Sequence, residues 1–263
     1  MQSKRIFITG GASGLGFALA QRCASAGWQV CIGDRDQERG EAVIGSLTKL
    51  QEDAFFMPCD VTRISDIEAV ATELQQRWDG VDVVVNNAGV AQVGQLTDTS
   101  IGDWQWILDI NLLGVVRGCK AFTPLFQSQG HGHFVNVASM AGLLDVPNMS
   151  AYNASKAAVV SLSETLENEL AKDNIYVTVV CPSFFKTNLG QGMRSTIEGM
   201  QDKLERLMTS SKLNAADVAE TIFAAIKSKR SHVLPHREGR IAWYFKRLLS
   251  RKLYRRVVHS RIK

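Results

Sequence analysis

The amino-acid sequence predicts an α/β fold in which a doubly wound parallel sheet carries helices on both faces. Short apolar strand segments alternate with amphipathic helical segments from residue 4 onward, a spacing typical of parallel sheets with crossover helices. A glycine-rich turn follows the first of these strands directly, at the position where such sheets bind phosphate groups. A length of 263 residues suits a single domain of this kind.

The composition is that of an ordinary globular protein, with 45% apolar and 21% charged residues. The sequence has no apolar run near the roughly 18 residues of a membrane span, and it enters a strand at once without a signal peptide. We therefore expect a cytoplasmic protein. The cysteines are odd in number and scattered, which predicts reduced, buried thiols and neither disulfides nor a metal site. They are Cys23, Cys31, Cys59, Cys119 and Cys181.

The net charge of +4 hides an asymmetry along the chain. Residues 227–263 contain 13 Lys and Arg but one acidic residue, Glu238, whereas residues 1–226 contain 17 Lys and Arg and 25 Asp and Glu. The body of the chain thus has a charge of −8 and its C-terminal part a charge of +12. Such a division predicts an interaction surface at the C-terminal end.

The first strand, residues 4–9, is followed by the sequence GGASGLG and by a helix that we expect to end near residue 26. Gly10 allows a tight turn, Gly14 allows the backbone to approach a pyrophosphate, and Gly16 allows the helix to pack closely. The helix N-terminus adds free N–H groups and a positive dipole. A glycine cluster alone is usually only a turn, but its place in the first strand–helix unit favours a phosphate site.

The second strand, residues 28–33, ends at Asp34. A carboxylate about 20 residues beyond the glycines can accept hydrogen bonds from both hydroxyls of an adenosine ribose and repels a 2′-phosphate, which favours NAD. The neighbouring Arg35 could pair with that phosphate, so NADP stays an alternative. Ser13, rather than a basic residue, in the glycine turn favours NAD again. Asp36 is equally well explained as a helix cap.

The remaining elements continue the alternation and place polar residues at strand ends. We expect helices at about 36–50 and 63–79, strands at 55–58, 81–89, 134–138 and 175–182, and a long helical segment at about 100–128. Asp60, Asn87 and Gly89 fall at strand ends, where such sheets bind ligands. Asn111 interrupts the long helix, either as a surface or capping residue or at a buried kink that binds water.

The next strand ends before Ser139, and a helix that contains Tyr152 and Lys156 follows. Tyr and Lys four residues apart lie on one helical face, where an ammonium group favours the phenolate and lowers its pKa. Ser139 could bring its hydroxyl to the same point. These residues could supply an acid/base, a cation that tunes it and a hydrogen-bond donor at one reacting oxygen. The Tyr-x-x-x-Lys pattern alone is weak, and its weight comes from the rest of the chain.

Together these residues resemble the short-chain dehydrogenase/reductases, in their commonest single-domain branch. The resemblance covers about residues 3–228 and is specific because the motifs occur jointly and in the family's order. It implies a Rossmann fold, a nicotinamide cofactor and a homodimer or homotetramer. The matching motifs are Thr9-Gly10-x-x-x-Gly14-x-Gly16, Asp60-Val61, Asn86-Asn87-Ala88-Gly89, Asn111, Ser139, Tyr152-x-x-x-Lys156 and Pro182.

The resemblance also implies roles for these residues. Tyr152 would be the general acid/base, Lys156 would bind the nicotinamide ribose and lower the tyrosine pKa, Ser139 would polarise the carbonyl or hydroxyl, and Asn111 would hold a water that links Lys156 to solvent. The cofactor residues would be Gly10, Ser13, Gly14, Leu15 and Gly16 at the pyrophosphate, Asp34 and Arg35 at the adenosine ribose, Asp60 and Val61 at the adenine, Lys156 at the nicotinamide ribose and Thr187 at the carboxamide. Asn87, Ala88, Gly89, Tyr152 and Pro182 would complete the cofactor site. Ser183 departs from the family's usual Pro-Gly, which leaves the substrate shape open.

The segment at about 188–212 would close over the substrate as a helical lid. Its apolar residues follow a 4-3-4-3 spacing, which predicts one helical stripe that packs in the core or contacts substrate. Three methionines on the stripe suit a bulky, adaptable apolar substrate. The stripe consists of Met193, Ile197, Met200, Leu204, Leu207 and Met208.

Residues 236–263 form a basic amphipathic tail beyond a domain that we expect to span residues 1–235. One helical side holds Ile241, Tyr244, Phe245, Leu248 and Leu249, and the apolar side changes after Ser250, so two short pieces are expected. Such helices lie on anionic membrane surfaces, but the tail could equally pack on the body or on a partner subunit. No nucleic-acid recognition motif accompanies the charge.

We therefore expect an oxidoreductase that transfers hydride between NAD(H) and a hydrophobic secondary alcohol or ketone. The same chemistry with NADP(H) is the close alternative. A non-catalytic, nucleotide-sensing protein recruited to a membrane or partner by its tail is a third hypothesis. The presence of Ser139, Tyr152 and Lys156 disfavours it.

Overall fold

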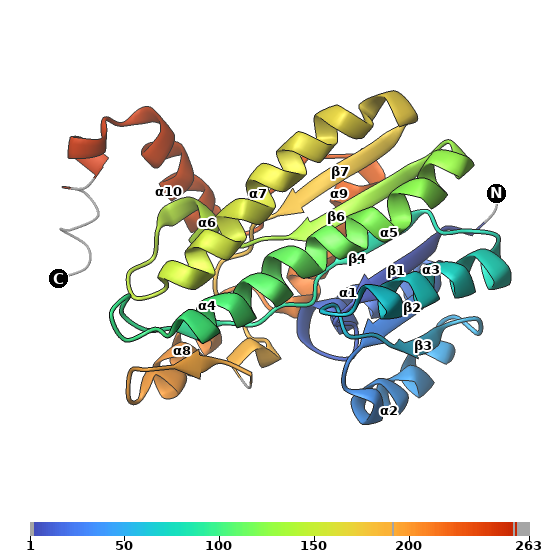
Figure 1. The fold of residues 1–263 in the computed structure, drawn as a ribbon, viewed down its shortest axis with the longest axis horizontal. Helices are drawn as coiled ribbons and strands as arrows, with labels where there is room; N and C mark the ends of the chain where they lie inside the picture. Colours follow the sequence, from blue (N-terminus) through green and yellow to red (C-terminus); the bar gives the residue numbers. More distant parts are fainter. Residues whose placement is uncertain (1–2, 191, 255, 257–263) are drawn as a thin grey trace.

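The computed structural model describes residues 3–190, 192–254 and 256 (Figure 1). Its centre is a seven-stranded sheet in the order β3-β2-β1-β4-β6-β7-β9, in which all neighbouring strands are parallel. The order reverses beside β1, so the predicted doubly wound sheet is confirmed. The strands are β1 Arg5–Thr9, β2 Gln29–Asp34, β3 Phe55–Pro58, β4 Val83–Asn86, β6 Gly132–Val137, β7 Ile175–Val180 and β9 His232–Val233.

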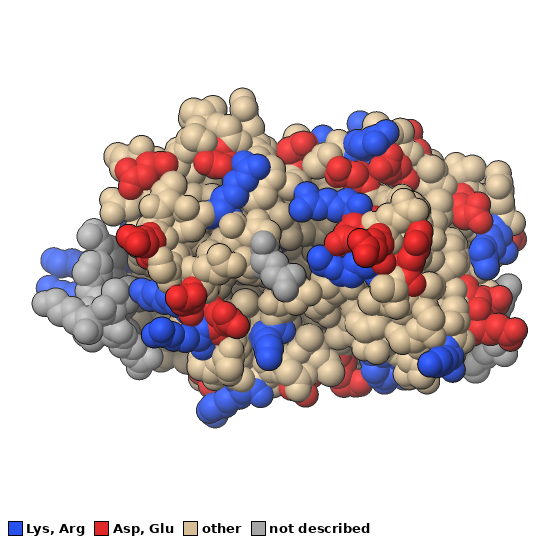
Figure 2. All heavy atoms as spheres, turned by 90° about the horizontal axis from the view of Figure 1, so that it is seen from below, with Lys and Arg blue, Asp and Glu red and all other residues tan. Residues whose placement is uncertain are grey.

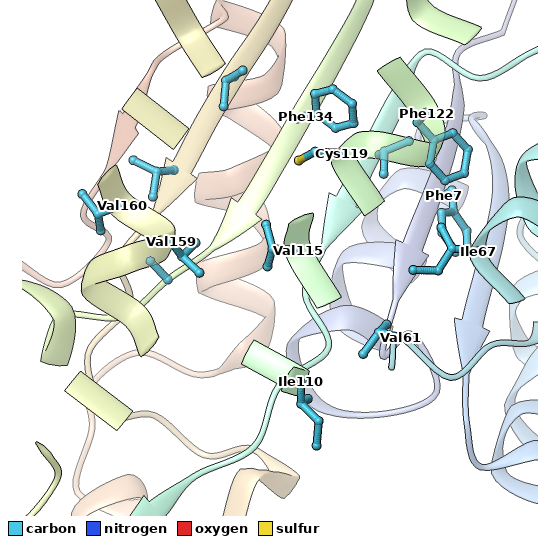
Figure 3. Packing of buried hydrophobic residues seen from close by; sticks show 14 of the residues in the cluster. Phe7, Val61, Ile67, Ile110, Val115, Cys119, Phe122, Phe134, Val159 and Val160 are labelled. Carbon is cyan, nitrogen blue, oxygen red and sulfur yellow. The ribbon is translucent and has the colours of Figure 1, made fainter. Parts of the chain in front are cut away.

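Helices cover both faces of the sheet and enclose two apolar clusters. Phe7 points into one cluster, whereas Ile6 and Ile8 point into the other, because side chains alternate along a strand. Figure 3 shows Phe7, Phe122 and Phe134 in the first cluster. Its helices are α3 Ile64–Trp78, α5 Gly114–Gln129 and α7 Ser150–Leu170, and those of the second are α1 Gly14–Ser25, α2 Gln37–Thr48 and α9 Ala215–Ser228.

The long helical segment contains the interruption that the sequence indicated. Helix α4 (Ile101–Leu108) passes into a π-helical segment, η1 (Asp109–Leu113), before α5 begins. Asn111 lies in η1 and is fully buried. The buried kink is therefore the correct interpretation of Asn111, and the surface position is wrong. Such π-helical turns are frequent at functional sites.

The expected lid is not one helical stripe. Helix α8 (Met200–Thr209) begins at Met200, so Met193 and Ile197 lie outside it. Before it, η3 (Asn188–Gly190) is a short 3₁₀ turn, and β8 (Arg194–Ser195) pairs with β5 (Gln92–Val93) in a separate two-stranded sheet. Leu204 and Met208 are buried, but Leu207 is 44% exposed. The strand pairing breaks the helical period, and the continuous stripe was wrong for this reason.

Other short elements complete the chain. Helix α6 (Ala141–Leu144) follows Ser139, and η2 (Ala171–Asp173) ends α7. At the C-terminal end, α10 (Arg237–Leu248) is followed by an extended Leu249, and the chain is helical again over residues 251–254. Two helical pieces were expected there, and the remainder of the second piece lies outside the described residues.

The surface mixes charges of both signs over the face that is seen in Figure 2. All five cysteines are buried and free. None of the described helices is long and apolar enough to cross a membrane. Among the described residues, no three His, Cys, Asp or Glu side chains group as metal ligands.

Candidate active site

A cavity of about 580 Å³ opens at the C-terminal ends of the strands. Of the residues that the sequence predicted as catalytic or cofactor-binding, all but Gly16 and Asn111 line it, so residues up to 177 positions apart in the chain share one site. The predicted residues in its wall are Gly10, Ser13, Gly14, Leu15, Asp34, Arg35, Asp60, Val61, Asn87, Ala88, Gly89, Ser139, Tyr152, Lys156, Pro182 and Thr187.

The glycine turn presents the positive N-terminal end of helix α1 to this cavity. Gly10 and Gly14 have φ angles of 63° and 53°, which a side chain would strain. Among the described residues, the Ser13 side chain makes no capping hydrogen bond to α1, and the first turn of α1 contains no acidic residue. The first amides of α1 are therefore free to bind an anion such as a pyrophosphate.

Gly16 lies beneath the turn and keeps it against the sheet. A Cβ at Gly16 would lie 2.3 Å from the Gly10 carbonyl oxygen and 2.6 Å from Asn87 Nδ2. Asn87 Nδ2 donates to the carbonyl oxygens of Thr9 and Gly10, at 2.9 and 3.2 Å. The Thr9 hydroxyl accepts from the N–H groups of Asn87 and Ala88, at 3.0 and 3.1 Å. These bonds hold the ends of β1 and β4 together, so Asn87 shapes the turn while it lines the cavity.

The carboxylate of Asp34 faces the glycine turn. Its two oxygens accept hydrogen bonds from the N–H groups of Ala12 and Asp36, at 3.2 and 3.1 Å. Arg35 is exposed beside it. Arg39, which the sequence analysis missed, also lines the cavity and pairs with Asp36 at 2.9 Å. Its only signal in the sequence is its place in the helix after Asp34, so both signs of charge meet at this end of the cavity.

Asp60 and Val61 form the wall beyond β3. The Asp60 carboxylate accepts from the backbone N–H and the hydroxyl of Thr62, at 2.9 and 2.8 Å. Val61 is 8% exposed, and its carbonyl oxygen accepts from Arg117 at 3.1 Å. Because the Asp60 side chain is turned to Thr62, the surface at this end of the cavity includes the apolar Val61 side chain.

Tyr152, Lys156 and Ser139 converge at the other end of the cavity. Tyr152 and Lys156 are 7% and 4% exposed, and the Lys156 ammonium lies 5.9 Å from the centroid of the tyrosine ring. Lys156 Nζ donates to the carbonyl oxygen of Val137 at 2.8 Å. The three functional groups thus come from the loop after β6 and from α7.

Burial dominates the charge states of this group. It raises the pKa of the Tyr152 phenol, and a hydrogen bond with Ser139 acts in the opposite direction. It lowers the pKa of Lys156 to about 8. The sequence predicted that Lys156 lowers the tyrosine pKa. The structure differs because the same low-polarity environment disfavours both charged forms and because the ammonium hydrogen-bonds to Val137.

Asn111 lies behind Lys156 and is held from two sides. Its Nδ2 donates to the carbonyl oxygen of Val90 and to the hydroxyl of Ser155, at 2.9 and 3.2 Å, and its Oδ1 accepts from the Val90 N–H at 2.8 Å. A Cβ at Gly89 would lie 3.1 Å from Asn111 Oδ1 and 3.4 Å from Lys156 Nζ. Both amide hydrogens of Asn111 are thus used. A water between Asn111 and Lys156 stays a prediction.

The loops after β6 and β7 are tied to each other beside Ser139. The Ser139 hydroxyl accepts from the Ala141 N–H at 3.1 Å, and the Met140 N–H donates to the Pro182 carbonyl oxygen at 2.8 Å. Ser183, the residue that departs from the family pattern, lines the cavity and donates its N–H to His236 Nδ1 at 3.1 Å. Ser183 therefore connects the cavity to the start of α10.

Apolar residues that the sequence analysis did not assign to the site also line the cavity. The sequence carried a partial signal for them, since the first two flank Asn111 on α4 and η1 and the last two follow Pro182. Trp106, Ile110 and Leu189 pack in the same apolar cluster as Tyr152, whereas Phe185 packs in the cluster on the other face of the sheet. These residues are Trp106, Ile110, Phe185 and Leu189.

The chain matches the family model described as short chain dehydrogenase over residues 4–198. This match covers most of the chain, and the protein therefore belongs to the short-chain dehydrogenase family of oxidoreductases. The resemblance that the order of the motifs indicated is thus confirmed as membership of this family. The parallel sheet with a cavity at its strand ends is the fold of the family.

Individual relatives agree with this assignment. A CLA biosynthesis dehydrogenase/reductase of Lactiplantibacillus plantarum is 28% identical over 90% of this chain and 89% of its own. A short-chain dehydrogenase/reductase of Burkholderia phymatum in complex with NAD has a TM-score of 0.87 and 32% identity over 93% of this chain and 92% of its own. A short-chain dehydrogenase of Sphingobium yanoikuyae in complex with NADPH has a TM-score of 0.76 and 26% identity over 88% and 87%. Similar proteins thus bind either nicotinamide cofactor.

Proposed function

We propose that this protein transfers hydride between NAD(H) and a hydrophobic secondary alcohol or its ketone. The observation that carries the proposal is the convergence of Ser139, Tyr152 and Lys156 at one end of a cavity whose other end holds the free N-terminus of α1. An anion site and an acid/base group in one continuous space suit a dinucleotide and a reacting oxygen.

The residues present fit a nicotinamide dinucleotide. The positive φ angles of Gly10 and Gly14 allow the backbone to approach a pyrophosphate, and the free amides of α1 would donate to it. Asp34 would accept from the adenosine ribose, and Lys156 would donate to the nicotinamide ribose. When bound, the nicotinamide ring would supply or accept the hydride at its C4 atom.

Tyr152 would exchange the proton with the substrate oxygen. In alcohol oxidation the phenolate accepts the hydroxyl proton as the hydride leaves the carbon, and in ketone reduction the phenol returns it. Because burial raises the pKa of Tyr152, the phenolate needs stabilisation from Ser139 and from a nearby positive charge. The Ser139 hydroxyl would donate to the same substrate oxygen and polarise it.

Asp34 supports NAD as the preferred cofactor. Its carboxylate already accepts two backbone N–H groups and faces the glycine turn, where a 2′-phosphate would meet a like charge. Arg35 and Arg39 support the alternative, NADP, since both line the same end of the cavity. We favour NAD because Arg39 is already paired with Asp36, whereas the Asp34 carboxylate lies closest to the turn.

The apolar wall supports a hydrophobic substrate. Trp106, Ile110 and Leu189 would contact its carbon skeleton, and burial of such surface contributes roughly 25 cal/mol for each Å² removed from water. Assembly as a homodimer or homotetramer stays a prediction from the family resemblance.

The experiment that tests this proposal is a panel of lipophilic secondary alcohols and ketones, assayed with all four cofactor forms. We expect turnover of at least one bulky apolar pair, with a larger kcat/KM for the NAD couple. Turnover restricted to small hydrophilic alcohols would refute the substrate class, and a larger kcat/KM for the NADP couple would refute the cofactor assignment. Tyr152→Phe is the control for the acid/base role, because this variant should fold and bind the dinucleotide like wild type.

A further inference from the structure

Helix α10 contacts the body of the protein through its smallest residues. Gly239 is buried, and a Cβ built on it would lie 3.0 Å from Met140 Cγ. Ala242 is half-buried on the same side. Lys246 lies one turn further and donates to the carbonyl oxygen of Leu143 at 2.6 Å and to the Asp145 carboxylate. The helix is thus fixed on α6 by close backbone approach and by a lysine, and Trp243 packs against the apolar core.

The large apolar residues of α10 face the other way. Ile241, Tyr244, Phe245 and Leu248 follow an i, i+3, i+4, i+7 pattern and therefore share one side of the helix. Their exposed fractions are 43%, 52%, 52% and 81%. A surface helix normally buries such a stripe against the core of its own protein. In α10 the apolar stripe instead faces solvent. Figure 1 shows α10 at the left edge, beyond the end of the sheet.

Basic residues surround this stripe. Arg237, Arg240 and Arg247 are exposed on α10, and Arg251, Lys252 and Arg256 follow it, all exposed. Glu238 is the only acidic residue from position 237 to the end of the sequence, and it lies 3.9 Å from Lys212. The exposed side of the helix therefore combines aliphatic and aromatic groups with an almost unopposed positive charge.

A second cavity lies between α10 and the body. Arg230, Arg240 and Arg247 line it, together with the aromatic side chains of Trp243 and Tyr244. Its one acidic residue, Glu164, is paired with His232 at 2.9 Å. Three guanidinium groups around a space of about 610 Å³ suit a phosphate-bearing headgroup next to the apolar stripe.

We propose that the exposed side of α10 docks this protein on an anionic phospholipid bilayer. A surface that is negatively charged and apolar a few Å deeper satisfies the stripe and the basic residues at once. A second copy of the chain fits less well, because the other exposed large apolar residues among those described are scattered over separate elements. These are Leu50, Ile64, Leu96, Ile101, Leu113, Leu207 and, just after α10, Leu253.

The docked face lies beside the cavity of the proposed reaction. Helix α10 packs against Met140, next to Ser139, and His236 at its start accepts from the Ser183 N–H. A bilayer at α10 would therefore lie at the same end of the sheet as the active site. The docking itself goes beyond the hydride transfer, and it holds or fails independently of the reaction.

The test uses the full chain and vesicle sedimentation. Phosphatidylcholine vesicles with and without about 30% phosphatidylserine are mixed with protein at low and high salt. The stripe variant is Ile241→Ser/Phe245→Ser/Leu248→Ser, and the charge variant is Arg240→Gln/Arg247→Gln. The matched control is Leu96→Ser/Ile101→Ser, which removes equally exposed apolar residues elsewhere. Circular dichroism of each variant verifies that the fold is retained.

We expect wild type and control to pellet with the anionic vesicles only, and less so at high salt. The stripe variant should bind about tenfold or more weakly, since the apolar side chains supply the insertion, and the charge variant should lose most of its preference for phosphatidylserine. Absence of wild-type pelleting overturns the proposal, as does an equal loss in the control. Light scattering without lipid measures the mass of the protein in solution. A mass that is lower for the stripe variant than for wild type would contradict the proposal and identify this side as an interface between copies.

Discussion

The active-site end of the sheet and helix α10 lie next to each other but bury opposite kinds of side chain. In the site, polar and titratable groups are buried, and each is held by named partners: Asn111 by Val90 and Ser155, and Lys156 by Val137. On α10, large apolar groups are exposed while Gly239 is buried. Buried polar groups are costly unless they are bonded, and exposed apolar stripes are costly unless they are covered. Each departure therefore indicates a function.

The first prediction separates the two regions most strongly. Tyr152→Phe should lower kcat by about 10²–10⁴-fold, because it removes the general acid/base and little else. Dinucleotide affinity and vesicle binding should stay near wild type, since the phenol contributes little to either. Steady-state kinetics and fluorescence titration measure the two effects. Residual activity above roughly 1% of wild type would contradict the assignment.

The second prediction concerns the adenosine end of the site. Asp34→Ser should change the kcat/KM ratio of NAD to NADP by roughly 10–100-fold towards NADP, because a carboxylate no longer repels the 2′-phosphate and Arg35 and Arg39 can pair with it. Asp36→Ser should move the ratio in the same direction but by less, since it releases Arg39 from its 2.9 Å ion pair and leaves the carboxylate at the glycine turn in place. A wild-type preference for NADP would contradict this prediction and show that Arg35 and Arg39, rather than Asp34, determine the cofactor preference.

The third prediction follows from the lowered pKa of Lys156, about 8 in the free protein. A ribose that accepts from the ammonium favours its protonated form, so binding raises this pKa and takes up a proton. Dinucleotide affinity should therefore be constant below pH 8 and fall above it, by up to about tenfold for each pH unit. Calorimetry at pH 7 and above pH 9 measures the change. Lys156→Met should bind more weakly and show no such dependence; a variant with the wild-type slope would assign the titration to another group.

The fourth and smallest prediction tests the packing behind the site. A Cβ at Gly118 would lie 2.0 Å from Asn86 Oδ1, and Asn86 Nδ2 donates to Asn136 Oδ1 at 2.8 Å. Gly118→Ala should lower the free energy of unfolding by about 1–3 kcal/mol through overpacking. Gly45→Ala, in α2 with no atom within 4 Å of its Cβ, should instead stabilise by roughly 0.5–1 kcal/mol. Thermal unfolding compares them, and equal shifts would contradict the account of this packing.

The sequence predicted most of the site because its residues follow strands that are long enough to show a pattern. Asp34 and Ser139 stand at or just after the ends of apolar strands, and parallel strands bring such ends to one edge. The apolar wall was not assigned, since Phe185 and Leu189 lie in a loop without periodicity. Strands of two residues, such as β8 and β9, are too short to show an alternating pattern in the sequence. Because β8 was not predicted, the lid was expected to be one continuous helical stripe.

Local sequence patterns also could not predict which side of α10 faces the body of the protein. Periodicity correctly placed Ile241, Tyr244, Phe245 and Leu248 on one side of a helix, but Leu249, which was expected beside them, is extended beyond the end of α10. It could not decide whether that side faces the body, because the decision depends on Gly239 against Met140, which is a contact between distant segments. The tyrosine pKa was mispredicted for a similar reason. The spacing of Tyr152 and Lys156 is local, but the burial that controls their charge comes from the whole fold.

The central claim is hydride transfer at the cavity that Ser139, Tyr152 and Lys156 line, and one measurement tests it most directly. The full chain is mixed with NAD and lipophilic secondary alcohols, and the absorbance of reduced nicotinamide is followed for wild type and Tyr152→Phe. We predict NADH formation by wild type that the variant loses by about 100-fold or more. Failure of wild type to reduce NAD or NADP with any alcohol, and to oxidise NADH or NADPH with the matching ketones, would contradict the claim.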